Sequence, residues 1–225
     1  MMRLLGDDDG SKFDPVEVIL IHGLGGNRWV MHPLFRHLLA NGFAPSKWNY
    51  WSTGNSVQRH AERLSRYLLE KRQGDRPLHF VTHSMGGIIL RAALSKMKWK
   101  RPGRLVMLAP PNHGAEVARI AARYLHYVCP ALTDISTEQT SMVHFLPPPG
   151  CQEFGVITAL HDALVHSRST YLKQQNDQIQ IACGHNRILF HRVALTETTH
   201  FLDHGRFSEE AMRPHAEASC DDTVV

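Results

Sequence analysis

Short apolar runs alternate with longer amphipathic segments along most of the chain. The runs are about six residues long and rich in β-branched residues, a pattern typical of strands buried on both faces of a sheet. They occupy residues 16–21, 77–82, 104–109, 154–159 and 188–195, with a weaker example at 47–52. The intervening segments place apolar residues three and four positions apart, which is the spacing of a helix face. Helices are therefore predicted at 29–40, 55–69, 85–97, 115–125 and about 208–218.

Strands separated by helices in this way form βαβ units, and such units build a parallel sheet with helices on both faces. We therefore predict an α/β fold, a three-layer sandwich with a mostly parallel sheet of about six strands, in a single domain covering residues 1–225. The segment 127–152 breaks the alternation, with Pro130 and three prolines at 147–149. A loop of this length is typical of a lid, a binding loop or a surface insertion. It is the candidate for a short cap.

Composition narrows the class of protein without changing this prediction. Hydrophobic residues make up 43% and charged residues 20% of the 225 residues, which excludes disordered and collagen-like chains. No apolar run approaches the roughly 18 residues of a membrane span. The N-terminus lacks the apolar core of a secretory signal, so a cytoplasmic protein is expected. The net charge of +4 is compatible with an acidic partner but does not require one.

The segment T-H-S-M-G-G at 82–87 lies between a predicted strand and a predicted helix. A serine on such a tight turn holds its Oγ above the sheet in strained backbone geometry, which is the arrangement called a nucleophile elbow. Small flanking residues let the helix and the strand approach each other. Gly86 fills one of these positions, whereas the bulkier Thr82 occupies the other. Ser84 is therefore the candidate nucleophile.

The segment H-G-L-G-G at 22–26 ends the first predicted strand. Glycines there permit a sharp turn and leave backbone N–H groups free to point into a cleft. Such donors stabilise the oxyanion that develops when a carbonyl is attacked. We assign this role to the N–H groups of Leu24 and Met85, and the helix that starts at Met85 adds its positive end. The segment lacks the features of a phosphate-binding loop.

An elbow serine also needs a base and an acid, in the chain order Ser, acid, His. The base is expected just beyond the last strand, and with that strand at 188–195 the candidate is His200. His204 is the close competitor. His185 and His191 lie before or within the predicted strand.

The candidate acid is Asp177, in a polar segment between the predicted strands 154–159 and 188–195. Asp162 follows the earlier strand more immediately and is the alternative. Asp203 follows the candidate base and is on the wrong side of it for this order. An aspartate in any of these positions also suits a turn or a helix cap.

Other polar clusters predict no further site. The stretch K-M-K-W-K-R-P-G-R at 96–104 is basic, but cations near a helix end complement its dipole, and no nucleic-acid partner is expected. The sequence contains neither H-E-x-x-H nor C-x-x-C, so no metal or other cofactor is predicted. The cysteines are too sparse for a disulfide framework, although a single bridge is compatible with them. They are Cys129, Cys151, Cys183 and Cys220.

Together these motifs resemble the α/β-hydrolase superfamily, in particular its small lipases and serine esterases. The matching segments are I-L-I-H-G-L-G-G at 19–26, F-V-T-H-S-M-G-G-I-I-L-R at 80–91, L-A-P-P-N-H-G-A-E-V-A at 108–118, F-G-V-I-T at 154–158, N-D-Q-I-Q-I at 176–181 and T-H-F-L at 199–202. The resemblance implies Ser84 as nucleophile, Asp177 as acid, His200 as base, and Leu24 and Met85 as oxyanion donors. In relatives the acid is commonly followed by Gly, whereas this chain has Gln.

The resemblance also implies an activity. We expect hydrolysis of carboxylic esters through an acyl-enzyme on Ser84, by a short- to medium-chain esterase or a lipase, with a small-molecule ester or lipid as substrate. Acyl transfer or thioester hydrolysis would use the same residues with a different acceptor or leaving group. A non-catalytic binding protein on the same scaffold is disfavoured because the residues of the site are intact.

Overall fold

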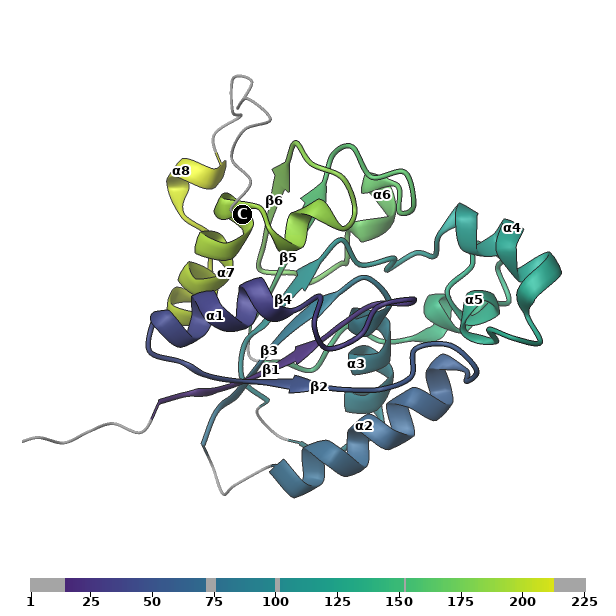
Figure 1. Cartoon of the computed structure of the whole chain (residues 1–225), viewed down its shortest axis with the longest axis horizontal. Helices are drawn as coiled ribbons and strands as arrows, with labels where there is room; N and C mark the ends of the chain where they lie inside the picture. The colour runs from purple at the N-terminus through teal and green to yellow at the C-terminus, as the bar shows by residue number, and fades with distance from the viewer. Residues whose placement is uncertain (1–14, 72–75, 100–101, 152, 213–225) are drawn as a thin grey trace, which may run out of the picture.

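A computed structural model of the chain describes residues 15–71, 76–99, 102–151 and 153–212. In these residues six strands form one sheet, in the order β2-β1-β3-β4-β5-β6 (Figure 1), and every neighbouring pair is parallel. The strands are β1 (Glu17–Ile21), β2 (Ala44–Trp48), β3 (Leu78–His83), β4 (Leu105–Leu108), β5 (Phe154–Ala159) and β6 (Asp177–Ile181). Because all strands run the same way, their ends meet at one side of the sheet, which we call the carboxyl edge. The opposite side is the amino edge.

Helices cover both faces of the sheet, as the alternation predicts. Alternate residues of β1 point to opposite faces, so Leu20 packs in one apolar core and Ile21 in the other. One face is covered by α1 (His32–Ala40) and α7 (Arg192–His204), and the other by α2 (Val57–Lys71) and α3 (Met85–Ser95). The three-layer α/β sandwich is therefore confirmed.

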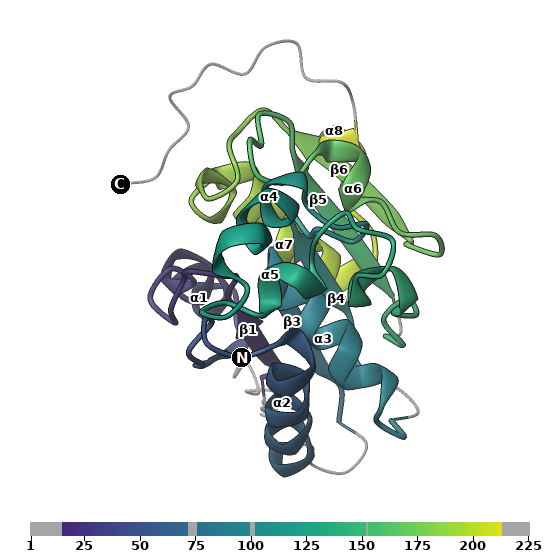
Figure 2. The ribbon, with the colours of Figure 1, turned by 90° about the vertical axis from the view of Figure 1, so that its right-hand side faces the viewer.

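Further helical segments accompany these four helices. They are α4 (Glu116–Leu125), α5 (Ala131–Asp134), η1 (Met142–Phe145), α6 (Ser167–Thr170), η2 (Arg187–Leu189) and α8 (Glu209–Met212). Figure 2 looks onto the carboxyl edge, with α4 and α5 in front of the strand ends. The segment 127–152 contains α5 and η1, and its residue 152 is outside the described residues. The helix predicted at about 208–218 is observed in its first part as α8. Residues 213–218 of that prediction are outside the described residues.

Two predicted strands differ from the structure. The weak run at 47–52 is displaced, because the strand observed there is Ala44–Trp48. The run at 188–195 is not a strand but comprises η2 and the start of α7. Its apolar residues belong to a helical stripe, in which Ala194, Leu195, Thr198, Phe201 and Leu202 are buried. The spacing of this stripe is helical, and it becomes visible only beyond residue 195.

The last strand of the sheet is β6, at its edge. Ile179 and Ile181 are buried there while Gln180 is exposed, so the strand has the alternation of a half-buried edge strand. Such a segment is less apolar than a central strand and resembles a polar loop. Among the described residues, no helix is long and apolar enough to cross a membrane.

Candidate active site

The turn between β3 and α3 consists of Ser84 alone. Its φ of 52° and ψ of −129° lie in a region that favours glycine. Ser84 N–H donates a 2.9 Å hydrogen bond to Leu108 O, which ties the turn to the end of β4. A side-chain-bearing residue held in such a conformation indicates a functional position, because the strain must be compensated by the rest of the fold. This is the backbone geometry of an elbow.

Glycines make room for this elbow. A Cβ on Gly86 would lie 2.6 Å from the carbonyl oxygens of both Ile21 and His22, so a glycine is required where α3 approaches β1. A Cβ on Gly87 would lie 3.1 Å from Thr82 Oγ1. The absence of a side chain at Gly87 therefore accommodates Thr82, which is bulkier than the residue usual at that position.

The loop that follows β1 passes directly over the elbow. A Cβ on Gly23 would lie 2.8 Å from Ser84 Cβ, so the loop backbone and the serine are in contact. Leu24 is the next residue of that loop. Met85 is the first residue of α3, where an N–H group has no partner within its own helix. The two N–H groups predicted as oxyanion donors therefore belong to segments that meet at Ser84.

His22 fixes the start of the same loop through its contacts with Tyr50. Its ring stacks on Tyr50 with centroids 4.3 Å apart, and Tyr50 Oη donates a 2.8 Å hydrogen bond to His22 O. Burial lowers the pKa of His22, so the imidazole is neutral near pH 7. The ring therefore supports the loop without placing a charge beneath it.

An aspartate and a histidine meet at the carboxyl edge, on the loops that follow β5 and β6. His185 Nδ1 lies 2.6 Å from Asp162 Oδ2, and the two side chains are 8% and 1% exposed. The loops run side by side, because His161 N–H donates to Cys183 O across them at 3.0 Å. This contact buries a carboxylate directly against an imidazole.

The electrostatics of Asp162 favour its ionised form. Burial alone raises the pKa of a carboxyl group, but hydrogen bonds from His185 and from the N–H groups of Val165 and Leu164 outweigh it and lower the pKa of Asp162. A carboxylate at Nδ1 keeps a proton on that nitrogen. The other ring nitrogen of His185, Nε2, is then a base.

His83 connects this pair to the elbow. It immediately precedes Ser84, and its Nε2 donates a 3.0 Å hydrogen bond to His185 O. The two rings lie 4.8 Å apart between centroids. Burial lowers the pKa of His83 to about 3, so this ring is neutral. The loop that carries His185 is therefore bonded to the residue beside the candidate nucleophile.

The structure does not bring the predicted acid Asp177 to this site. Asp177 is the first residue of β6 and pairs in register with Gly155 near the start of β5, so it lies at the amino edge, whereas Ser84 follows the end of β3. Its carboxylate accepts N–H hydrogen bonds from Phe207 and from Gln178, both at 2.8 Å. Asp177 therefore has a structural role in joining β6 to the segment that follows α7.

The predicted base His200 is also at the amino edge. It lies in α7 rather than in a loop, and its Nδ1 donates to Arg206 O at 2.9 Å. Arg104, just before β4, donates to Leu202 O and Asp203 O, which places this end of α7 beside the start of β4. Because Ser84 lies beyond the opposite end of the sheet, the expected pairing of Ser84 with Asp177 and His200 is corrected.

The alternative candidates for the acid and the base are also divided between the two edges of the sheet. His204 ends α7, and its ring packs against that of His200 with centroids 4.5 Å apart. Asp203 lies beside it, and His191 immediately precedes α7. Asp162, the alternative acid, and His185, which precedes the run predicted as the last strand, are the residues that the fold brings together.

The signal that identifies His185 was present in the sequence but was obscured by the strand assignment. The base of an elbow serine is expected just beyond the last strand of the sheet, after the acid in the chain. With β6 as the last strand, this expectation points to His185, and Asp162 precedes His185 in the chain and contacts its ring.

Metal-binding clusters and disulfides are both absent from the described part of the chain. No group of three or more His, Cys, Asp or Glu side chains is placed there to hold a metal ion. Cys129, Cys151 and Cys183 are free thiols, and Cys220 lies outside the described residues.

Comparison with known proteins defines the class. The model of the alpha/beta hydrolase family matches residues 18–213, which is most of the chain. The protein therefore belongs to the α/β-hydrolase family. A search of curated proteins found no match to the sequence.

Solved structures with the same fold include lipases and esterases. The mature lipase BlEst2 of Bacillus licheniformis is 16% identical, with a TM-score of 0.64 over 78% of this chain and 87% of that one. A metagenomic carboxyl esterase is 15% identical, with a TM-score of 0.65 over 83% and 71%. The type II thioesterase YbtT of yersiniabactin biosynthesis is 16% identical, with a TM-score of 0.60 over 86% and 94%. At these identities the similarity establishes the fold.

Proposed function

We propose that this protein is a serine hydrolase that cleaves carboxylic esters, as a short- to medium-chain esterase or a lipase. The observation that carries the proposal is the buried Asp162–His185 pair, bonded through His83 to the strained turn at Ser84. Together with Leu24 and Met85 N–H, this arrangement contains a nucleophile, a base, an orienting acid and an oxyanion site.

The reaction follows from the roles of these groups. His185 Nε2 accepts the proton of Ser84 as Oγ attacks the ester carbonyl, and the carbonyl electrons move onto the oxygen. The N–H groups of Leu24 and Met85 stabilise that oxyanion. His185 then protonates the leaving alcohol, which gives an acyl-serine. Water repeats the sequence with His185 as base and releases the carboxylic acid.

We further propose that the chain forms a single hydrolase domain in which 127–152 is a short cap. Arg91 of α3, which is buried, donates to Leu146 O at 2.6 Å and to Pro147 O at 3.2 Å. A side chain of the nucleophile helix thus holds the end of this segment.

A fluorophosphonate probe tests the proposed nucleophile directly. We expect covalent labelling of Ser84 in the folded wild-type protein, located by mass spectrometry, and none in Ser84→Ala. A nitrophenyl ester series of increasing acyl length then defines the preferred substrate. Folded protein that is neither labelled at Ser84 nor active on any of these esters would be a binding protein rather than a hydrolase.

Thioester hydrolysis is the second candidate, because a type II thioesterase has the same fold over 94% of its length. The same residues would act, with a thiol as the leaving group. Parallel assays on an acyl thioester and on the oxygen ester of the same acyl chain distinguish the two, since the preferred substrate has the higher kcat/KM. Added alcohols that capture the acyl group would instead identify an acyltransferase.

A further inference from the structure

Helix α4 presents its larger apolar residues to solvent. Its small residues Ala118, Ala121 and Ala122 pack toward the core, whereas Val117, Ile120, Tyr124 and Leu125 are exposed. Helices of soluble proteins normally have the opposite arrangement, with the large apolar residues inside.

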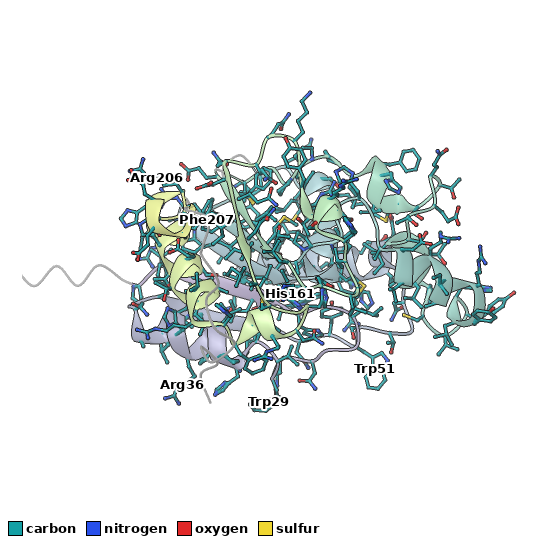
Figure 3. The ribbon with its side chains drawn as sticks, turned by 90° about the horizontal axis from the view of Figure 1, so that it is seen from above. Trp29, Arg36, Trp51, His161, Arg206 and Phe207 are labelled. Atoms are coloured by element: carbon teal, nitrogen blue, oxygen red, sulfur yellow. The ribbon has the colours of Figure 1, made fainter. Side chains whose placement is uncertain are left out.

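The exposed apolar surface continues beyond the helix. Tyr127 is 86% exposed and Val128 is 68% exposed. Of the fifteen exposed large hydrophobic residues in the described part of the chain, six fall between Val117 and Val128. Trp51, 76% exposed, joins them from another loop, because Gly54 beside its ring donates a hydrogen bond to Val128 O. Figure 3 shows the Trp51 side chain pointing away from the body of the protein.

We call this surface the α4 tip, made of Val117, Ile120, Tyr124, Leu125, Tyr127, Val128 and Trp51. It projects from the carboxyl edge, the side of the sheet on which Ser84 lies (Figures 1 and 2). A contiguous exposed apolar surface of this kind indicates a binding face.

The charges beside the tip identify its partner. Arg123 and His126 are exposed within it. The one acid of α4, Glu116, is held by Arg119, which also lies 3.7 Å from Glu138. The solvent side of the tip therefore combines aliphatic and Tyr or Trp side chains with the guanidinium group of Arg123, a combination typical of helices that lie in the headgroup region of a membrane.

We propose that the α4 tip docks on an anionic lipid surface and presents the active site to esters held there. The tip would insert its aliphatic and aromatic side chains between headgroups, with Arg123 close to their phosphates. The assignment of lipid esters as substrates rests on the proposed function, whereas the docking does not.

The test measures binding apart from catalysis. Ser84→Ala protein is sedimented with vesicles of phosphatidylcholine alone and with vesicles that also contain phosphatidylserine. We expect binding to the anionic vesicles, weakened by salt. Adding Tyr124→Ser and Tyr127→Ser should reduce that binding by about tenfold or more, and adding Arg123→Gln should reduce it by about fivefold. The control is Leu69→Ser on α2, which replaces an exposed apolar residue outside the tip and should leave binding unchanged.

Several outcomes would overturn the proposal. These are absence of binding to anionic vesicles, an equal loss in the Leu69 control, or a dimer in analytical ultracentrifugation that the tyrosine variant dissociates, since a second copy would then be the partner. The wild-type rate on a water-soluble nitrophenyl ester separates the two proposals. An inactive protein that still binds vesicles refutes the hydrolase and retains the lipid surface.

Discussion

The two edges of the sheet carry similar residues with different consequences. At the carboxyl edge, Asp162 and His185 bond to each other. At the amino edge, Asp177 and His200 bond separately to backbone groups of the segment around Arg206 and Phe207. In both pairs the aspartate follows Ser84 and precedes the histidine in the chain, which is the order that an elbow serine requires. Residue type and chain order therefore do not define a catalytic set in a parallel sheet, because only the carboxyl ends of the strands lie on the side of the candidate nucleophile.

Replacing the two histidines should give the largest contrast. His185→Ala removes the proposed base and should lower kcat by about 10⁶-fold. His200→Ala removes a hydrogen bond on the far side of the sheet and should change kcat less than about twofold, because it does not contact the site. Ester hydrolysis by the two purified variants measures this difference. A strong loss in His200→Ala at native stability would restore the earlier assignment.

The two aspartates should differ almost as much. Asp162→Asn no longer holds the Nδ1 tautomer of His185 and should lower kcat by roughly 10⁴-fold. Asp177→Asn should keep most of the activity but lower the free energy of unfolding by about 1 kcal/mol, because an amide accepts the N–H of Phe207 less strongly than a carboxylate. Kinetics and urea unfolding on the same preparations separate the two effects.

His83 tests whether the link between the pair and the elbow matters. His83→Leu removes the donor to His185 O and should lower kcat by about tenfold to a hundredfold with little change in KM, because the base loop loses its position. His83→Gln retains an N–H at a similar place and should recover much of that loss. Equal kcat values for His83→Leu and His83→Gln would show that the side chain at position 83 acts through the space it fills and not through its hydrogen bond to His185 O.

The same residue should make stability depend on pH. Burial lowers the pKa of His83 to about 3, whereas an unfolded histidine titrates near 6.5. Protons therefore bind the unfolded chain preferentially as pH falls below 6.5, and stability is lost progressively down to the folded pKa. This group should reduce the free energy of unfolding by about 2 kcal/mol between pH 7 and pH 5. Denaturant unfolding of His83→Gln should show a pH dependence smaller by that amount.

Much of the fold and half of the site were accessible from the sequence. The central strands are mostly apolar and buried along their whole length, and the elbow motif carries its own local geometry. The strand β3, Ser84 and the glycine loop could therefore be placed without tertiary information. The last strand could not, because β6 at the sheet edge is half polar while the start of α7 is apolar. The base is expected just beyond the last strand of the sheet. Taking 188–195 instead of β6 as that strand therefore makes His200, and not His185, the expected base.

At Ser84 the backbone conformation that the proposed chemistry uses is unfavourable for the stability of the fold. A φ of 52° is a conformation that a glycine adopts freely and a serine does not. Ser84→Gly should therefore melt no lower than Ser84→Ala, despite the entropy that glycine ordinarily loses on folding. The glycine variant would relax the backbone strain at this turn, so selection for turnover at this position would oppose selection for heat resistance.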